Sequence, residues 1–310
     1  MKLILSLFSP LLAVALLVST TVMAADTPAY PRKKILFFSK SSGFEHGVVK
    51  QTNGQPSFAD KMLQEFGKKY NIEFVCTKDG SLITKEYLAQ FDAFCFFATG
   101  DLTTEGDDHN PPMTPAGKQA ILDAVSAGKG CIGIHSGADC FHGHATTDMG
   151  PKRWAQDYAK ADPFIKMIGG EFIAHDKEAD APLIIADPKF PGISAIPKDW
   201  ILHEEWYTYK HYAPDLHVIL AQDTAAIPQP SYARPNYPET WAHMYGRGRS
   251  FYTSLGHRND VWKNPIFESI LMGGINWALG RVNADVTPNI QTVTPGANEL
   301  PEIYRKRARQ

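Results

Sequence analysis

One short motif places a histidine where an enzyme would present a reactive group. His135 closes the apolar run 129–135 and is flanked by glycines, in Gly133-Ile134-His135-Ser136-Gly137. Small neighbours of this kind permit the sharp strand-to-helix turn that presents a nucleophile in other α/β enzymes. An imidazole in that position can move a proton or bind a metal ion. A glycine-rich turn with a hydrogen-bonded histidine gives the same pattern, so both interpretations stay open.

Further histidines and acidic residues stand near the ends of other apolar segments. Nitrogen ligands suit zinc or a similar borderline ion, so the sequence predicts a site for a divalent metal such as zinc. One predicted ligand set comes together only on folding and consists of His135, His175 and His257. The alternative is a local cluster beside the motif, formed by Asp139, His142 and His144. His142 and His144 could equally be surface residues of a loop.

The spacing of apolar residues predicts alternating strands and helices through the first half. Strands are expected at residues 33–39, 71–77, 91–99 and 129–135, with helices at 58–70, 84–90 and 115–127. This alternation predicts an α/β fold with a doubly wound, flavodoxin-like open sheet that binds ligands at the carboxyl ends of its strands. His46 and His135 follow the first and fourth strands. We expect these to be neighbouring strand ends that face one crevice.

The second half is less regular and is interpreted as insertions into the same domain. Strands are predicted at residues 171–175, 183–186, 206–209, 217–221, 241–245 and 250–255, and a closing helix at 265–279. Gly246-Arg247-Gly248-Arg249 is typical of a hairpin connection. The expected organisation is one domain over residues 25–280 and a C-terminal extension over 281–310, which is either an extended wrap or a frayed end.

Composition and charge narrow the possible partners. Of the 310 residues, 44% are hydrophobic and 21% charged, which is typical of a globular protein. Lys and Arg number 31 against 33 Asp and Glu, a net charge of -2. Without a basic surplus to neutralise phosphates, nucleic acid is not expected as a partner. The four cysteines lack zinc or redox spacing and are predicted to be free.

The N-terminus resembles a secretory leader. Lys2 precedes an apolar run over residues 3–18, and Val22-Met23-Ala24 supplies the small residues that signal peptidase recognises. We expect cleavage after Ala24 and a periplasmic or secreted protein. The alternative is an uncleaved anchor, but polar and proline residues interrupt the run and leave it short of the ~20 apolar residues of a spanning helix. No stable membrane span is expected after cleavage.

Several stretches together resemble the ThuA-like, or trehalose-utilisation, family, whose fold is similar to that of class I glutamine amidotransferases. The resemblance spans nearly the whole chain after the leader and rests on residues 35–46, 133–138, 168–175, 204–207, 246–257 and 276–278, with Trp241. One departure is Glu204, where the family usually has Asp. The amidotransferase nucleophile is a cysteine, whereas the equivalent residue here is His135, so glutaminase activity is not expected.

The resemblance implies carbohydrate metabolism, and a 3-keto-glycoside is a coherent substrate because its ketone acidifies the neighbouring C–H. Proton abstraction could lead to elimination, hydrolysis or isomerisation. The expected catalytic residues are His135 or Glu205 as base and His257 as acid. Substrate contacts are expected from His46, Ser136, Trp206, Tyr207 and Trp241, with a tryptophan as the stacking platform.

Burial beside Trp206 and Tyr207 is expected to raise the pKa of Glu205 toward the working range. The alternative function is a non-catalytic, secreted carbohydrate-binding protein. Clustered titratable groups favour the enzyme, because binding alone does not require them.

Overall fold

The computed structural model describes residues 30–142 and 151–309. The predicted leader, residues 1–24, lies outside this part of the chain, as does His144. Within the described residues, no helix has the length and apolar character needed to span a membrane.

The first half follows the predicted alternation closely. Its elements are β1 (Lys33–Phe38), α1 (Phe58–Tyr70), β2 (Ile72–Thr77), α2 (Lys85–Ala89), β3 (Ala93–Phe96), β4 (Thr99–Gly100), α3 (Pro115–Ser126) and β5 (Gly130–Ile134). Helix α1 begins at a capping box, in which the side chains of Ser57 and Asp60 each bond the other residue's backbone N–H. Helix α3 begins at Thr114, whose hydroxyl accepts from Gly117 N at 3.0 Å. Local signals therefore set both helix starts.

The second half adds strands and short helices. They are β6 (Asp139–Cys140), α4 (Pro151–Trp154), α5 (Pro163–Ile168), β7 (Glu171–His175), β8 (Ala179–Ile185), β9 (Ile201–Glu204), β10 (Tyr207–Lys210), β11 (His217–Gln222), β12 (Tyr237–Tyr245), β13 (Gly248–Thr253), α6 (Asn259–Trp262) and α7 (Pro265–Ala278). The predicted hairpin joins β12 to β13, with Tyr245 paired to Gly248. Strands β6 and β9 and helices α4, α5 and α6 were not predicted.

The main sheet is mixed. Its order is β2-β1-β3-β5-β13-β12-β11-β8-β9. The first five strands are parallel, whereas β12, β11, β8 and β9 continue the sheet in antiparallel pairings. The predicted α/β class is confirmed, and the insertions extend the sheet. The first and fourth predicted strands, β1 and β5, are not neighbours, because β3 pairs with both.

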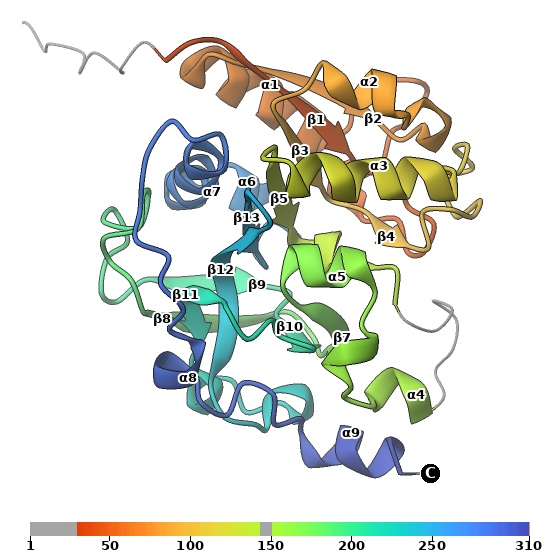
Figure 1. The fold of residues 1–310 in the computed structure, drawn as a ribbon. Coiled ribbons are helices and arrows are strands. Elements are labelled where there is room, and N and C mark those ends of the chain that lie inside the picture. The colour runs from red at the N-terminus through yellow and green to blue at the C-terminus, as the bar shows by residue number, and fades with distance from the viewer. Residues whose placement is uncertain (1–29, 143–150, 310) are drawn as a thin grey trace, which may run out of the picture.

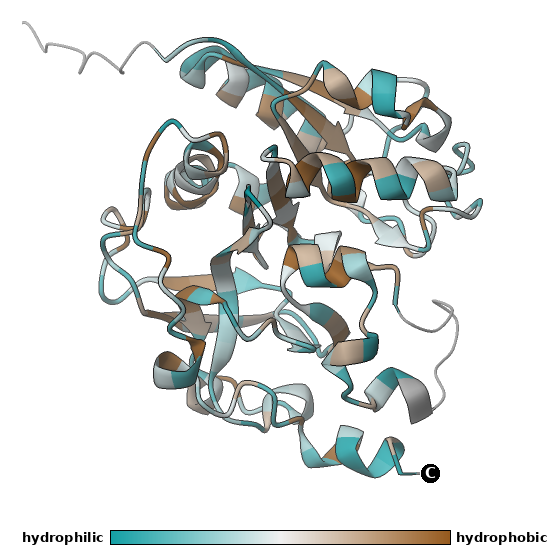
Figure 2. Cartoon of the chain, viewed as in Figure 1, coloured by the Kyte–Doolittle hydropathy of each residue, from teal (hydrophilic) through white to brown (hydrophobic). Residues whose placement is uncertain are grey.

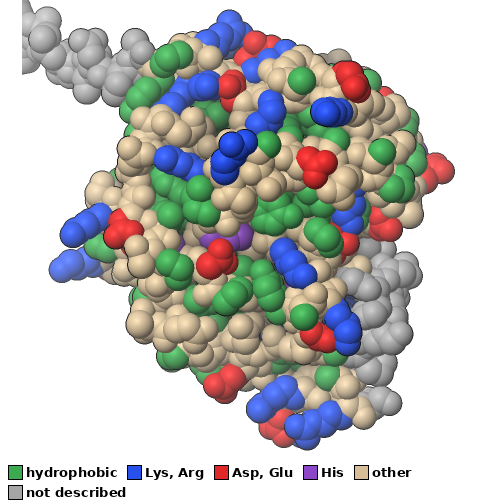
Figure 3. All heavy atoms as spheres, viewed as in Figure 1, with side chains coloured by type: hydrophobic (Ala, Val, Ile, Leu, Met, Phe, Trp, Pro, Cys, Tyr) green, Lys and Arg blue, Asp and Glu red, His purple; other side chains and the backbone are tan. Residues whose placement is uncertain are grey.

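Helices cover both faces of the parallel strands. Helices α1, α6 and α7 form one layer and α2, α3 and α5 the other (Figure 1). The inner parallel strands β3 and β5 are fully buried, whereas β2 at the sheet edge is partly exposed, and the apolar composition of the inner strands is visible in Figure 2. On the face drawn in Figure 3, acidic and basic side chains are interspersed.

The C-terminal extension packs against the domain. It carries α8 (Ile290–Val293) and α9 (Glu302–Arg307). Ile290, Leu300 and Tyr304 are buried, and the Tyr304 ring stacks on Trp154 with centroids 4.4 Å apart. The extension therefore wraps the body and does not fray. All four cysteines are free.

Candidate active site

Four ionisable side chains meet at the carboxyl edge of the parallel strands. They are His46, His135, Glu205 and His257, whose potential ligand atoms all lie within 4.8 Å of one another. The three histidines follow β1, β5 and β13, which run parallel and therefore end at the same edge. Glu205 lies in the short connection between β9 and β10. We call this group the four-residue centre.

The turn after β5 holds His135 in a strained backbone conformation. Its φ is 44°, in the left-handed region that non-glycine residues rarely adopt. A Cβ on Gly133 would lie 2.6 Å from a ring carbon of Tyr252. One on Gly137 would lie 2.7 Å from the carbonyl oxygen of Phe96. The two glycines therefore permit the close packing that presents His135, and the predicted sharp turn is confirmed.

The imidazole of His135 is fixed on its outer side. Nδ1 donates to the carbonyl oxygen of Ser254 at 2.7 Å, which leaves a lone pair on Nε2. Nε2 lies 3.2 Å from Nδ1 of His257 and 3.4 Å from Oε2 of Glu205. Metal-binding histidines show this arrangement, with one nitrogen bonded to a carbonyl group and the other facing the remaining ligands.

His257 has a carboxylate on its outer side. Its Nδ1 lies 3.2 Å from Oε2 of Glu205, and its Nε2 lies 3.4 Å from Oε1 of Glu178. Glu178 also pairs with Arg258. A carboxylate on the outer nitrogen fixes the orientation of a ligand imidazole and raises its basicity. Glu178 was missed by the sequence reasoning, because no spacing rule links it to His257.

His46 completes the group with an unsatisfied nitrogen. Its Nε2 lies 3.2 Å from the hydroxyl oxygen of Tyr207, whereas its Nδ1 is buried without a hydrogen-bond partner among the described atoms. Burial, together with the charges of His135 and His257, lowers the pKa of His46 well below its ordinary value. The ring is therefore neutral and keeps a lone pair. Because a buried polar atom without a partner is costly, this nitrogen fits a ligand role.

Taken together, the four side chains could hold a metal ion. The lone pair on His135 Nε2, the imidazoles of His46 and His257 and the ionised carboxylate of Glu205 converge there. His46 was predicted to contact substrate, and the structure places it among the potential ligands. His175, by contrast, is outside the group.

The acidic pair Glu204 and Glu205 differs from the expectation. Burial alone would raise the pKa of Glu205, but the imidazoles of His135 and His257 beside its carboxylate outweigh burial and hold the pKa well below its ordinary value. Burial raises the pKa of Glu204 to about 7. The expected raised pKa is thus wrong for Glu205 and occurs at Glu204. Both carboxylate oxygens of Glu204 accept backbone N–H groups, from Glu205 and Gly256, each at 2.9 Å.

A pocket of about 550 Å³ adjoins the four-residue centre. It is lined by Gly47, Val48, Glu178, His257, Arg258, Asn259 and Asp260. His257 therefore belongs both to the centre and to the pocket wall. The other lining side chains are mostly charged or amide groups, which can bond the hydroxyl groups of a small polar ligand.

The predicted tryptophan contacts are wrong. Trp206 and Trp241 are both fully buried, with their indole N–H groups donating to the carbonyl oxygens of Ala179 and Ile168 at 2.8 Å. Neither ring can offer a face to a sugar. Tyr207 does reach the centre, stacking obliquely on the His135 ring at a centroid distance of 4.0 Å.

Other predicted residues lie around the centre. Ser136 is fully buried, and its hydroxyl has no partner among the described atoms. His175 is half-exposed, with Nδ1 3.1 Å from Oε1 of Glu205. From the alternative metal cluster, Asp139 and His142 hydrogen-bond each other, and His142 Nδ1 lies 2.9 Å from Oε1 of Glu171. Both ring nitrogens of His142 therefore already have carboxylate partners.

Comparison with known proteins places this site in a family. The model of the trehalose-utilisation family ThuA matches residues 34–278, most of the chain. The chain belongs to this family. The match includes every member of the four-residue centre. No curated protein matches the chain.

Solved structures show the same ThuA-like fold. A ThuA-like protein from Bacteroides uniformis superposes with a TM-score of 0.59 at 16% identity, covering 85% of this chain and 98% of its own. One from Parabacteroides merdae gives a TM-score of 0.52 at 18% identity, covering 83% and 93%. At these identities the likeness concerns the fold alone.

Proposed function

We propose that this ThuA-family chain is a carbohydrate-active enzyme whose four-residue centre binds a divalent metal such as zinc. The observation that carries the proposal is the convergence of His46, His135, Glu205 and His257 beside a polar pocket. Three imidazoles and one carboxylate suit zinc or a similar borderline ion. A bound ion of this kind polarises a carbonyl oxygen and stabilises the negative charge that develops there.

The proposed substrate is an oxidised sugar or glycoside that carries a ketone at C3. Membership of the trehalose-utilisation family supports a carbohydrate, and a ketone is the group that a Lewis-acidic centre would activate. The ketone acidifies the proton on C2. Removing that proton gives an enolate, which can expel the C1 substituent; that group takes up a proton as it leaves, and water adding to the resulting double bond completes a hydrolysis. Reprotonation of the enolate at another position gives isomerisation.

Proton removal requires a base that lines the pocket and is not one of the four potential ligands. His135 is fully buried, and Glu205 is engaged by two imidazoles of the centre and by His175. Glu178 instead lines the pocket, with one carboxylate oxygen 3.4 Å from His257. We therefore assign the base to Glu178, while His135 and Glu205 serve as ligands. The neighbouring Arg258, which pairs with Glu178, orients that carboxylate.

Deuterium exchange tests this function directly. The full chain without its leader would be loaded with zinc and incubated in D2O with 3-keto-trehalose, and mass spectrometry would follow deuterium at C2 and any released sugar. We expect exchange or cleavage in the wild type and their loss in His135→Ala. His109→Asn, at an exposed histidine that is not one of the four potential ligands, is the control.

Binding of the sugar with neither exchange nor cleavage would support the alternative, a non-catalytic carbohydrate-binding protein. Action in the periplasm or outside the cell is a separate proposal, which rests on the leader predicted over residues 1–24. The intact mass of the exported protein, beginning at Ala25, tests it.

A further inference from the structure

An aromatic ring stands open to solvent beside the four-residue centre. Phe44 is 66% exposed and is the most exposed aromatic side chain in the described part of the chain. Its ring meets that of His46 edge-on, with centroids 5.0 Å apart and an interplanar angle of 89°. A large apolar surface at this position is therefore continuous with the site and in contact with one potential ligand.

The loop that carries Phe44 is held in place by its backbone. The carbonyl oxygen of Thr99 accepts from Ser42 N at 2.9 Å and from Gly43 N at 3.1 Å. The Thr99 hydroxyl donates to the carbonyl oxygen of Phe44 at 2.9 Å. These three bonds attach residues 42–44 to strand β4.

Two glycines allow the chain to approach this loop closely. A Cβ on Gly100 would lie 2.5 Å from Gly43 N, and one on Gly106 would lie 2.1 Å from the Cα of Ser42. Backbone therefore packs directly on backbone on two sides of the loop. The exposed ring of Phe44 is therefore attached to a loop whose backbone is fixed. A fixed loop lowers the entropic cost of binding a ligand against the ring.

We propose that Phe44 is the platform on which a pyranose ring stacks as it enters the pocket. This inference rests on the proposed function and adds a specificity-determining residue to it. A pyranose has an apolar C–H face and a rim of hydroxyl groups. Covering an exposed aromatic ring with the C–H face removes apolar surface from water, while charged pocket residues, Glu178, Arg258 and Asp260, can bond the hydroxyls.

Affinity for an unreactive sugar tests the platform apart from the chemistry. Isothermal titration with trehalose, which carries no ketone, would compare the wild-type chain with Phe44→Ala and Phe44→Trp. We expect Phe44→Ala to weaken binding by about two- to tenfold, the range of a single aromatic face contact. Phe44→Trp, which keeps a flat ring, should bind within about twofold of the wild type or more tightly.

Ile303→Ala is the matched control, because Ile303 is an exposed apolar side chain, 40% accessible, on α9. With 3-keto-trehalose, Phe44→Ala should raise KM more than it lowers kcat, as expected for a contact made equally in the ground and transition states. Unchanged affinity and KM in Phe44→Ala would overturn the inference. So would a change confined to the oligomeric state, measured by light scattering.

The two proposals fail in distinguishable ways. If the wild type shows no deuterium exchange but Phe44→Ala still weakens trehalose binding, the enzymatic function fails and the platform stands. If exchange depends on His135 while Phe44→Ala binds like the wild type, the platform fails and the enzyme stands.

Discussion

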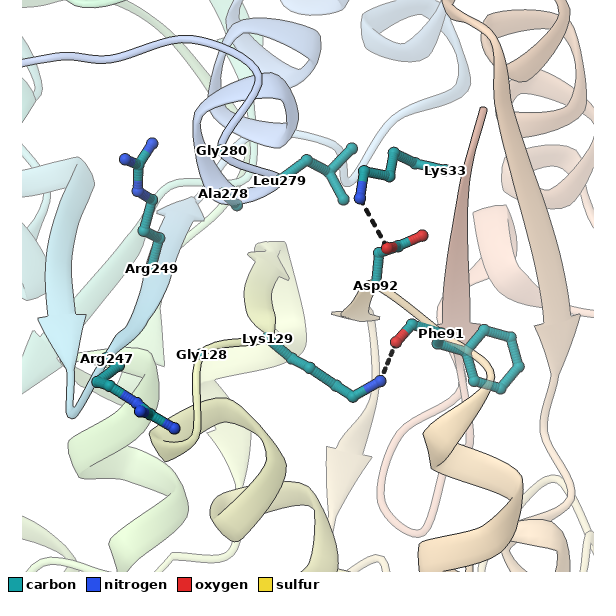
Figure 4. A pocket seen from close by; sticks show the side chains of 10 residues that line it. All are labelled: Lys33, Phe91, Asp92, Gly128, Lys129, Arg247, Arg249, Ala278, Leu279 and Gly280. Atoms are coloured by element: carbon teal, nitrogen blue, oxygen red, sulfur yellow. Dashed lines mark hydrogen bonds and ion pairs between the residues drawn. The ribbon is translucent and has the colours of Figure 1, made fainter. Parts of the chain in front are cut away.

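Ionisable side chains cluster at both edges of the parallel sheet, but their hydrogen-bond partners differ between the two edges. At the amino edge, a hollow of about 290 Å³ is lined by Lys33, Asp92, Lys129, Arg247 and Arg249, among others (Figure 4). At the carboxyl edge lies the four-residue centre. Four of the side chains named at the amino edge are cationic and one is a carboxylate, so charge alone would point to a ligand site there.

The hydrogen-bond partners of the charged side chains show that the amino edge is structural. Lys129 Nζ donates to the carbonyl oxygens of Leu88 and Ala89 at the end of α2. Arg247 donates to the carbonyl oxygen of Ala127 at the end of α3, and Arg249 to that of Trp277 at the end of α7, both at 2.9 Å. The C-terminal end of a helix carries partial negative charge, so these cations stabilise three helices.

At the carboxyl edge, not every donor and acceptor atom has a partner within the fold. A lone pair on His135 faces the group, and one nitrogen of His46 has no partner among the described atoms. This comparison indicates that a cluster of ionisable side chains is structural when each member already has hydrogen-bond partners in the fold. A cluster whose donor atoms converge on one another is a candidate for ligand binding. The predictions below test this distinction.

The largest effect is expected at the four-residue centre. His135→Ala removes a ligand-type nitrogen that is fully buried, and it should lower turnover of 3-keto-trehalose by roughly 10⁴-fold. Initial rates at saturating zinc measure this, with circular dichroism to confirm folding. Turnover within tenfold of the wild type in a folded variant would contradict a catalytic role for the centre.

A smaller effect is expected on the pocket wall. Glu178→Gln keeps the shape of the side chain but removes the proposed base, so turnover should fall by roughly 10²- to 10³-fold. Zinc stoichiometry at saturating metal should be unchanged, since none of the four potential ligands is altered. Full turnover would remove Glu178 from the mechanism and leave the metal proposal intact.

A substitution at the amino edge should lower stability and leave turnover unchanged. Arg249→Met removes charged hydrogen bonds to Trp277, Val282 and Asn283 and should lower the free energy of unfolding by about 1–3 kcal/mol. Urea denaturation measures the loss, and kcat is expected to be unchanged. A stable variant with impaired turnover would break the distinction between the two edges.

The smallest effect is a pH dependence at the same edge. Burial alone would raise the pKa of Asp92, but hydrogen bonds from Lys33 and from Lys34 N–H outweigh it and lower the pKa, with the charge of Lys129 adding to them. A lowered pKa in the folded state stabilises the fold above the unfolded pKa, and this stability is lost as pH falls through the folded pKa.

The wild type should therefore exceed Asp92→Asn in unfolding free energy at neutral pH by no more than about 1 kcal/mol, because the pair is partly exposed. The difference should shrink under acid. Denaturant melts from pH 7 down to the acid limit of folding measure it. A gap that widens toward low pH would show the opposite sign.

Local signals predicted the first half of the fold well. The run Phe58–Tyr70 has helical spacing and a cap, and the apolar strands are buried on both faces, so each signal lies within a few residues of its element. Strand β9 escaped prediction because it is short and sits at the sheet edge, where Ile201 is exposed. The position of β3 between β1 and β5 depends on pairing between distant segments, which no local sequence pattern indicates.

The site was predicted in part for the same reason. The glycines that flank His135 in the sequence predict the turn in which it lies. The role of His46 instead depends on contacts with residues far along the chain. Glu204 and Glu205 are adjacent, and only the folded partners decide which carboxyl has the raised pKa. Trp206 and Trp241 looked like sugar platforms because burial of an aromatic residue cannot be read from its identity.

Metal content tests the central claim most directly. The chain from Ala25 to Gln310 would be treated with chelator, loaded with zinc, desalted and analysed by inductively coupled plasma mass spectrometry, next to His135→Ala and His109→Asn. The account predicts a single bound ion per chain in the wild type and in His109→Asn, and its loss in His135→Ala. A folded wild type that retains no zinc, or a His135→Ala variant that retains it fully, would contradict the account.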